Sequence, residues 1–247
     1  MSKKSLMLIF LLTLLTQSII SLTDLVKVDV SASQLPKLYV NPPSIVDTTL
    51  TAGTKFNVTI NVADITELNP LFAYTFKLWW DRPLLNWTKV IQGTDGTDSF
   101  LQQGGDTSFY AKKYQTQGYI YVSATLQAPY TPVTGSGLLV TTEFLVEQLG
   151  ITLLKLNETQ LLKPPIFPGG DPIPFDSTAE NGYFSNIIPG DINIDGKVTA
   201  LDVYALGRAY GTKQGIPNWN PNADIDKDLV VGTSDLGILS KNYGKTT

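Results

Sequence analysis

Residues 191–202 read DINIDGKVTALD, and residues 224–235 read DIDKDLVVGTSD. Both segments have Asp or Asn at positions 1, 3 and 5 and Asp at position 12. This is the spacing of an EF-hand-type calcium loop, in which carboxylate, amide and carbonyl oxygens surround a hard cation. The sequence therefore predicts two calcium ions.

The predicted ligands follow from the loop positions. Side chains at positions 1, 3, 5, 9 and 12 and the backbone carbonyl at position 7 face the ion in such a loop. In the first loop these positions hold Asp191, Asn193, Asp195, Thr199, Asp202 and, at position 7, Lys197. In the second loop the expected ligands are Asp224, Asp226, Asp228, Asp235 and, at position 7, Val230.

The two loops differ at position 6, which is Gly196 in the first and Leu229 in the second. That turn favours a positive φ, which costs a branched side chain about 1 kcal/mol or more. We expect the second site to be weaker or slightly reshaped.

Each loop is followed by apolar residues at positions i, i+3 and i+7, which is one stripe of a helix. The two stripes are Val203, Leu206 and Tyr210, then Leu236, Leu239 and Tyr243. Gly211 and Gly244 follow as stop signals, and Thr199 can cap the first helix. Val198 and Val231 are expected to pair the two loops through a short β contact.

Composition excludes several classes of function. The 247-residue chain has a net charge of −4 and lacks both Cys and His. Disulfides, thiolate or imidazole metal sites, Cys nucleophiles and His bases are therefore absent. Without a sizeable basic cluster, nucleic acid is not an expected partner.

Residues 1–21 read as a secretory signal peptide, with Lys3 and Lys4 before an apolar run, and residues 22–35 as a spacer. An uncleaved membrane anchor is the alternative. We expect a secreted or cell-surface protein of bacterial or archaeal type. In such a protein Asn57, Asn86 and Asn157, each in an N-x-T triplet, are candidate glycosylation sites.

Residues 36–186 predict an all-β domain. Short segments alternate apolar and polar residues and are separated by Gly, Pro, Asn and Asp clusters, which is typical of a β-sandwich or jelly roll. Strands are expected over residues 55–62, 74–80, 119–124, 138–146, 151–156 and 180–185. Trp79 and Trp80 should point to opposite faces of their strand.

The duplicated loop and helix, with the lead-in WNPNAD at residues 219–224, resembles the type I dockerin family, whose modules bind cohesin domains. The resemblance implies a small all-α module over residues 187–247. It also implies partner contacts at Ala200, Leu201, Gly207 and Arg208, and at Thr233, Ser234, Ser240 and Lys241. Because both halves carry such residues, a two-fold rotated docking is a further implication. Ordinary exposed helix residues are the alternative.

The β domain, over residues 36–186, resembles the cohesins, which are nine-stranded jelly rolls. The resemblance is carried by FNVTINV at 56–62, FKLWWD at 76–81, GSGLL at 135–139 and NGYF at 181–184. Cohesins share their fold with carbohydrate-binding modules, which leaves sugar binding open.

These features predict a non-catalytic scaffold or adhesion protein that assembles through calcium-dependent cohesin–dockerin contacts, with a link to polysaccharide binding or degradation. No pair of carboxylates suited to glycoside hydrolysis stands out in the β domain. The rival interpretation is a surface protein whose sandwich grips polysaccharide and whose dockerin module anchors it. Its candidate sugar platform is Trp79 with Tyr110, Tyr114, Tyr119, Tyr121 and Tyr130; packing at the core or sheet edge is the alternative for these rings.

Overall fold

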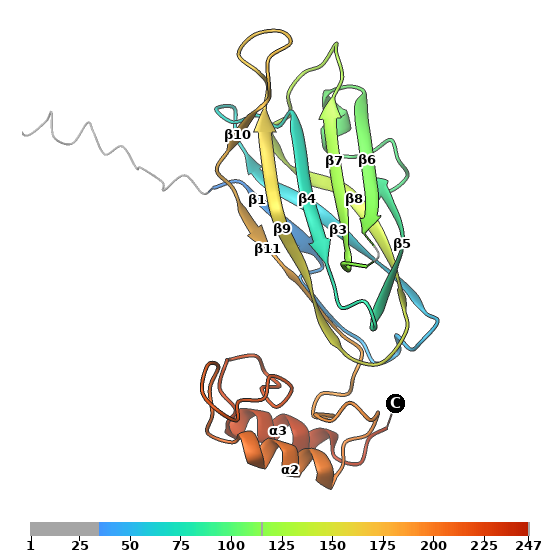
Figure 1. Ribbon diagram of the computed structural model, residues 1–247, viewed down its shortest axis with the longest axis vertical. Coiled ribbons are helices and arrows are strands. Elements are labelled where there is room, and N and C mark those ends of the chain that lie inside the picture. The colour runs from blue at the N-terminus through green and yellow to red at the C-terminus, as the bar shows by residue number, and fades with distance from the viewer. Residues whose placement is uncertain (1–34, 115, 247) are drawn as a thin grey trace, which may run out of the picture. The chain divides into compact units, whose positions relative to one another are not determined.

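The computed structural model describes residues 35–114 and 116–246. The predicted signal peptide at 1–21 and all but the last residue of the spacer at 22–35 lie outside this part of the chain. Within it, no helix is long and apolar enough to cross a membrane. Figure 1 shows its strands and helices.

In the described part of the chain, all strands precede the two α-helices. The strands are β1 (Lys37–Asn41), β2 (Ser44–Val46), β3 (Lys55–Ile65), β4 (Ala73–Trp79), β5 (Leu85–Gln92), β6 (Thr107–Tyr114), β7 (Tyr119–Leu126), β8 (Gly135–Val146), β9 (Ile151–Lys163), β10 (Ile173–Phe175), β11 (Thr178–Glu180) and β12 (Gly182–Ser185). The 3₁₀ helix η1 (Leu101–Gly104) precedes β6, and the α-helices are α2 (Ala200–Ala209) and α3 (Thr233–Asn242).

The strands form two sheets. One has the order β11-β1-β3-β8-β5, and the other has the order β2-β12-β9-β4-β7-β6, with β10 added against β9. Figure 1 looks onto the second sheet, with the strands of the first behind it. The predicted sandwich is confirmed.

Period-two alternation explains why these segments bury one face. Phe76 and Leu78 of β4 are fully buried, and Trp80 just beyond it is nearly so. Trp80 donates its indole N–H to the Leu85 carbonyl at 2.7 Å, which satisfies the polar edge of a buried ring. Trp79 is only partly buried, so the two Trp side chains take opposite faces, as predicted.

The single strand expected over residues 180–185 is wrong in one respect. The structure has two strands there, with a break at Asn181. β11 pairs with β1 in one sheet, whereas β12 pairs with β9 in the other. Asn181 accepts the Leu156 backbone N–H at 3.0 Å through its side-chain oxygen. Because side chains of a strand alternate without marking which sheet they face, the pattern did not reveal the crossing.

The C-terminal module has its own small apolar core. Its buried members are Ile188, Ile192, Val198, Leu206, Ala209, Ala223, Val231 and Leu239. α2 and α3 both contribute to it, and they lie side by side in Figure 1.

Most of the apolar stripes predicted for these helices do not face that core. Of the six residues, only Leu206 and Leu239 are buried, and the other four are exposed. The buried side of α2 carries Asp202, Leu206 and Ala209 instead. Position 12 of the calcium loop has to point inward, and this requirement fixes the rotation of the helix.

The expected pairing of Val198 with Val231 is also wrong. Val198 exchanges backbone hydrogen bonds with residues 244–245, at 2.8 and 3.0 Å. Val231 does the same with residues 211–212, at 2.8 and 2.9 Å. Each loop therefore pairs with the segment that follows the helix of the other repeat.

Candidate calcium loops and docking surface

The first loop is folded around its position-1 carboxylate. The two oxygens of Asp191 accept the backbone N–H groups of Asp195 at 3.1 Å and Gly196 at 2.9 Å. Asn193 donates its amide to the Asp195 carboxylate at 3.0 Å, and Asp195 accepts the Lys197 N–H at 3.0 Å. These bonds bring the oxygen-bearing side chains of positions 1, 3 and 5 to the inside of one turn.

The position-12 carboxylate closes the first loop from the helix. Asp202 is fully buried and accepts the N–H groups of Ile192 at 2.8 Å and Asn193 at 3.2 Å with one oxygen. Its other oxygen accepts the Thr199 N–H at 2.8 Å. The Thr199 hydroxyl in turn accepts the Leu201 N–H at 3.2 Å, which confirms the predicted cap.

The second loop repeats this construction. Asp235 is fully buried and accepts the N–H groups of Ile225 at 2.6 Å, Asp226 at 3.2 Å and Gly232 at 2.7 Å. Among the described residues, oxygens of Asp224, Asp226 and Asp235 lie within 4.8 Å of one another. Position 5, Asp228, accepts the Val230 N–H at 2.8 Å.

Two observations show that these residues fit a divalent cation. One oxygen of Asp224, a side chain only 2 % exposed, is buried without a hydrogen-bond partner. Burial also raises the pKa of both Asp191 and Asp224 above the ordinary carboxyl value. A bound cation would give the orphaned oxygen a partner and would favour the ionised form of both carboxyls. Calcium, when bound, supplies this compensating positive charge.

Both loops use the left-handed backbone region at positions 4 and 6. The φ angles are +58° at Ile194 and +82° at Gly196, and +65° at Lys227 and +71° at Leu229. The second loop therefore keeps the shape of the first without the glycine. Leu229 is 51 % exposed, so its burial offsets little of the backbone strain.

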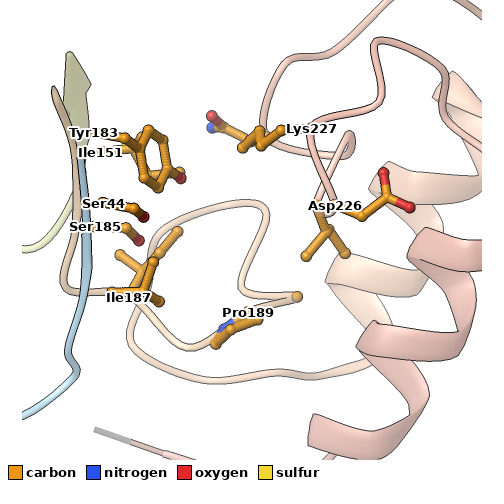
Figure 2. A pocket seen from close by; sticks show the side chains of 12 residues that line it. Ser44, Ile151, Tyr183, Ser185, Ile187, Pro189, Asp226 and Lys227 are labelled. Carbon is orange, nitrogen blue, oxygen red and sulfur yellow. The ribbon is translucent and has the colours of Figure 1, made fainter. Parts of the chain in front are cut away.

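Sequence spacing gave no role to position 4 of the second loop. The Lys227 ammonium donates to the backbone carbonyls of Asp224 at 2.6 Å and Pro221 at 2.9 Å. Lys227 and Asp226 are also among the side chains that line a pocket of about 440 Å³, drawn in Figure 2. No spacing rule marks a lysine at this position, so only the folded loop reveals the contact.

The predicted partner residues are all accessible. The set comprises Ala200, Leu201, Gly207, Arg208, Thr233, Ser234, Ser240 and Lys241, and each is exposed. Tyr204, which the sequence patterns did not single out, lies one helical turn after Leu201 and is 65 % exposed. The corresponding position of α3 is Gly237, so the two helices present different surfaces.

The aromatic residues of the sandwich pack mainly on one another. Trp79 lies against Tyr119 with ring centroids 4.4 Å apart, and Tyr114 stacks on Tyr119 at 4.6 Å. Tyr119 itself is buried. Tyr110, 51 % exposed, and Tyr130 are the most open rings of the set.

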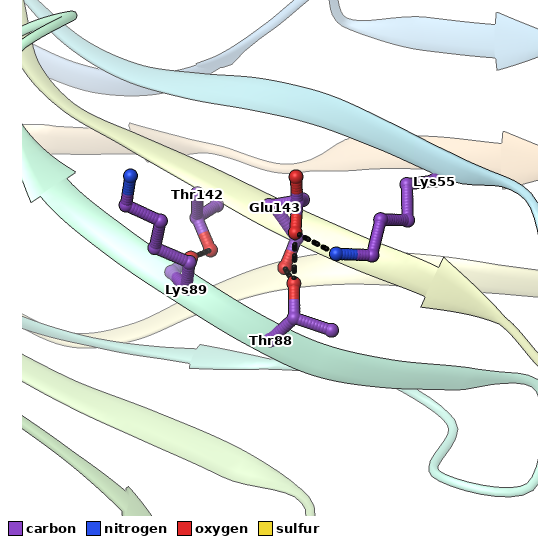
Figure 3. A network of polar contacts seen from close by, with 5 residues as sticks. All are labelled: Lys55, Thr88, Lys89, Thr142 and Glu143. Atoms are coloured by element: carbon purple, nitrogen blue, oxygen red, sulfur yellow. Dashed lines mark hydrogen bonds and ion pairs between the residues drawn. The ribbon is translucent and has the colours of Figure 1, made fainter.

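The three N-x-T triplets lie on strands. Asn57 on β3 and Asn157 on β9 are exposed, whereas Asn86 on β5 is partly buried and accepts the Lys113 ammonium at 2.7 Å. In the Asn86 triplet, the Thr88 hydroxyl donates to the Glu143 carboxylate at 2.6 Å, which also accepts Lys55 at 2.8 Å (Figure 3). Glycosylation at these sites stays a prediction.

No curated protein matches the chain. Among solved structures, similar ones include a cohesin of Acetivibrio cellulolyticus scaffoldin B in complex with a dockerin, at 12% identity over 62% of this chain and 99% of that one, with a TM-score of 0.46. A type I cohesin from Pseudobacteroides cellulosolvens gives 14% identity, coverages of 62% and 92%, and a TM-score of 0.43. A non-cellulosomal cohesin from Archaeoglobus fulgidus gives 14% identity over 61% of this chain and 90% of that one, with a TM-score of 0.43.

The family comparison bears on the C-terminal module, where the calcium loops and the exposed helix residues lie. The part of the chain that contains both loops, α2 and α3, residues 189–243, matches the family model of the dockerin type I domain.

Proposed function

We propose that this chain is a secreted or cell-surface assembly protein in which a calcium-loaded dockerin module docks onto a cohesin domain, while the β-sandwich is itself a receptor for dockerin modules. The observation that carries the proposal is the dockerin match over residues 189–243, which contains two loops with inward-facing carboxylates. The proposal assigns the chain no catalytic role and places its work in the degradation or binding of polysaccharide.

Calcium dependence follows from how the module is held together. Its buried core has eight apolar residues, which is little for a module of this size. Buried carboxylates at positions 1 and 12 of each loop add charges that repel one another without a cation. Calcium removes this repulsion and should therefore be coupled to folding of the module.

The exposed side of α2 supports docking through this helix. Leu201, 62 % exposed, and Tyr204 provide apolar surface, and Arg208 provides a charge on the same side. Aromatic and arginine side chains commonly carry binding energy at protein interfaces. Leu201 and Tyr204 form an apolar surface with the Arg208 cation beside it. A sheet face of a cohesin that offers hydrogen-bond acceptors can bind such a surface.

Two experiments test the proposal, each in calcium and in excess chelator. Sedimentation of the full chain measures self-association, and immobilised cohesin and dockerin modules measure capture of the chain. We expect capture or self-association in calcium and release in chelator. The Leu201→Asp variant should lose capture by cohesin, whereas Leu68→Asp, which changes a still more exposed leucine of the β domain, should retain it.

A chain that stays monomeric and captures neither module, in calcium or in chelator, would refute the proposal. Self-association that persists in Leu201→Asp would refute the assigned surface alone. Retention on insoluble polysaccharide without any protein partner would favour the rival carbohydrate-binding function.

A further inference from the structure

The two calcium loops differ in how their own side chains balance charge. At positions 1, 3, 5 and 12 the first loop has three carboxylates and one amide, and the second has four carboxylates. In the first, the Asn193 amide donates to Asp195 at 3.0 Å. The equivalent Asp226 cannot donate to Asp228, since both are carboxylates. The second loop thus has one more negative charge and one fewer internal donor.

Lys227 supplies a positive charge at this point of the second loop. Its left-handed backbone, with φ at +65°, turns the chain between positions 3 and 5. The ammonium is fixed by two carbonyl bonds, to Asp224 at 2.6 Å and to Pro221 at 2.9 Å. The first loop has the uncharged Ile194 at this position, in the same backbone region.

The charge of Lys227 acts on the same carboxylates that a calcium ion would join. Burial lowers the pKa of Lys227, and the attraction of Asp224, Asp235 and Asp226 opposes that shift. Oxygens of these three carboxylates converge within 4.8 Å. One Asp224 oxygen, buried with the rest of that side chain, remains without a partner. The ammonium therefore offsets part of the repulsion in the loop but does not give this oxygen a partner.

We propose that Lys227 is a tethered counter-ion of the second loop, which stabilises that loop before calcium arrives and thereby lowers its affinity for calcium. This inference rests on the calcium dependence in the proposed function. Since the charge favours the metal-free state and repels the incoming ion, its removal has two effects of opposite sign. The metal-free module loses stability, and one calcium site gains affinity.

Calorimetric calcium titration of the full chain tests the inference, with melting followed by far-ultraviolet circular dichroism in excess chelator. The variant Lys227→Gln keeps the length of the side chain and an amide donor but removes the charge. We expect one of two sites to gain about tenfold in affinity, as one unit charge at short range supplies. The melting temperature in chelator should fall, while that in saturating calcium should change less.

Two controls separate the tethered contact from a general charge effect. Lys213→Gln removes an exposed lysine that lies outside both loops and should leave stability in chelator unchanged. Lys227→Arg keeps the charge and should retain the wild-type affinities. Affinities within about twofold of wild type in Lys227→Gln, or an equal gain in calcium affinity in Lys213→Gln, would overturn the inference. A wild-type chain that binds no calcium would instead overturn the calcium dependence of the proposed function.

Discussion

Gly244 tests whether the second repeat needs a left-handed backbone conformation after its helix. Its φ is +83°, and a Cβ added there would meet no atom within 4 Å. The substitution Gly244→Ala therefore introduces backbone strain without a steric clash. A left-handed conformation costs an L-residue about 1–2 kcal/mol. Loss of freedom in the unfolded chain returns about 0.4–1 kcal/mol, so the net destabilisation of the module should be about 1 kcal/mol.

Gly237, in the helix that precedes Gly244, is the matched control. It lies inside α3, and a Cβ there also meets nothing within 4 Å. Because it is helical, Gly237→Ala should stabilise the module by about 0.5–1 kcal/mol. The two Gly→Ala changes therefore have opposite signs, although neither makes a new contact.

Thermal melting of the full chain at 222 nm, in excess chelator, measures both changes. A shift of 1 kcal/mol moves the melting temperature of a domain of this size by about 4–8 °C. Gly244→Ala should melt lower than wild type and Gly237→Ala higher. A Gly244→Ala module as stable as wild type would refute the argument from backbone conformation, and so would equal destabilisation by both changes.

Three further predictions follow from the module. Deletion of residues 244–247 removes two backbone hydrogen bonds to Val198, at 2.8 and 3.0 Å. The free energy of unfolding, measured by chemical denaturation, should fall by about 2 kcal/mol. Calcium affinity should fall at the first site and stay unchanged at the second. Leu201→Asp should weaken cohesin capture more than Ser234→Asp, because α3 has Ser234 and Gly237 where α2 has Leu201 and Tyr204. Equal losses in surface plasmon resonance would indicate two-fold docking. Burial raises the pKa of Asp224. The carboxyl proton of Asp224 therefore binds more tightly to the folded metal-free module than to the unfolded chain. Protonated Asp224 contributes stability at acid pH, and this contribution is lost as pH rises through the pKa of the folded state. Asp224→Asn should therefore flatten the pH dependence of melting in chelator, and an unchanged profile would contradict the assignment.

The calcium loops were the most predictable part of the molecule. Carboxylates at fixed spacing act through local backbone bonds, as Asp191 does with residues 195 and 196, so short-range sequence contains most of the information. Helix starts and ends were predictable for the same reason, from Thr199 at one end and Gly211 and Gly244 at the other.

Contacts between distant segments were not predictable in this way. Val198 was expected to meet its counterpart Val231, because repeats suggest symmetry, but its backbone is bonded to residues 244–245. The apolar residues Val203 and Tyr210 suggested a buried stripe, but the buried Asp202 rotates them outward. Tertiary contacts determine both the pairing of Val198 and the rotation of the helix. Such contacts cannot be inferred from the pattern of a single sequence.

Leu229 adopts a backbone conformation that a branched side chain disfavours, without a change of fold. Its left-handed backbone was expected to disfavour the turn, yet the second loop adopts the same turn as the first, with φ at +71°. The hydrogen bond from its backbone N–H to Asp224, at 3.2 Å, helps to hold this conformation.

The crossed pairing of the two repeats has a consequence for the order of events during synthesis. Val198 has its backbone partners in residues 244–245, so the first loop cannot complete its pairing while those residues are still inside the ribosome. The strands of the sandwich end at Ser185, so they are synthesised before the module and can pair first. The backbone pairing that ties the first loop to the second repeat therefore forms only after residues 244 and 245 have left the ribosome.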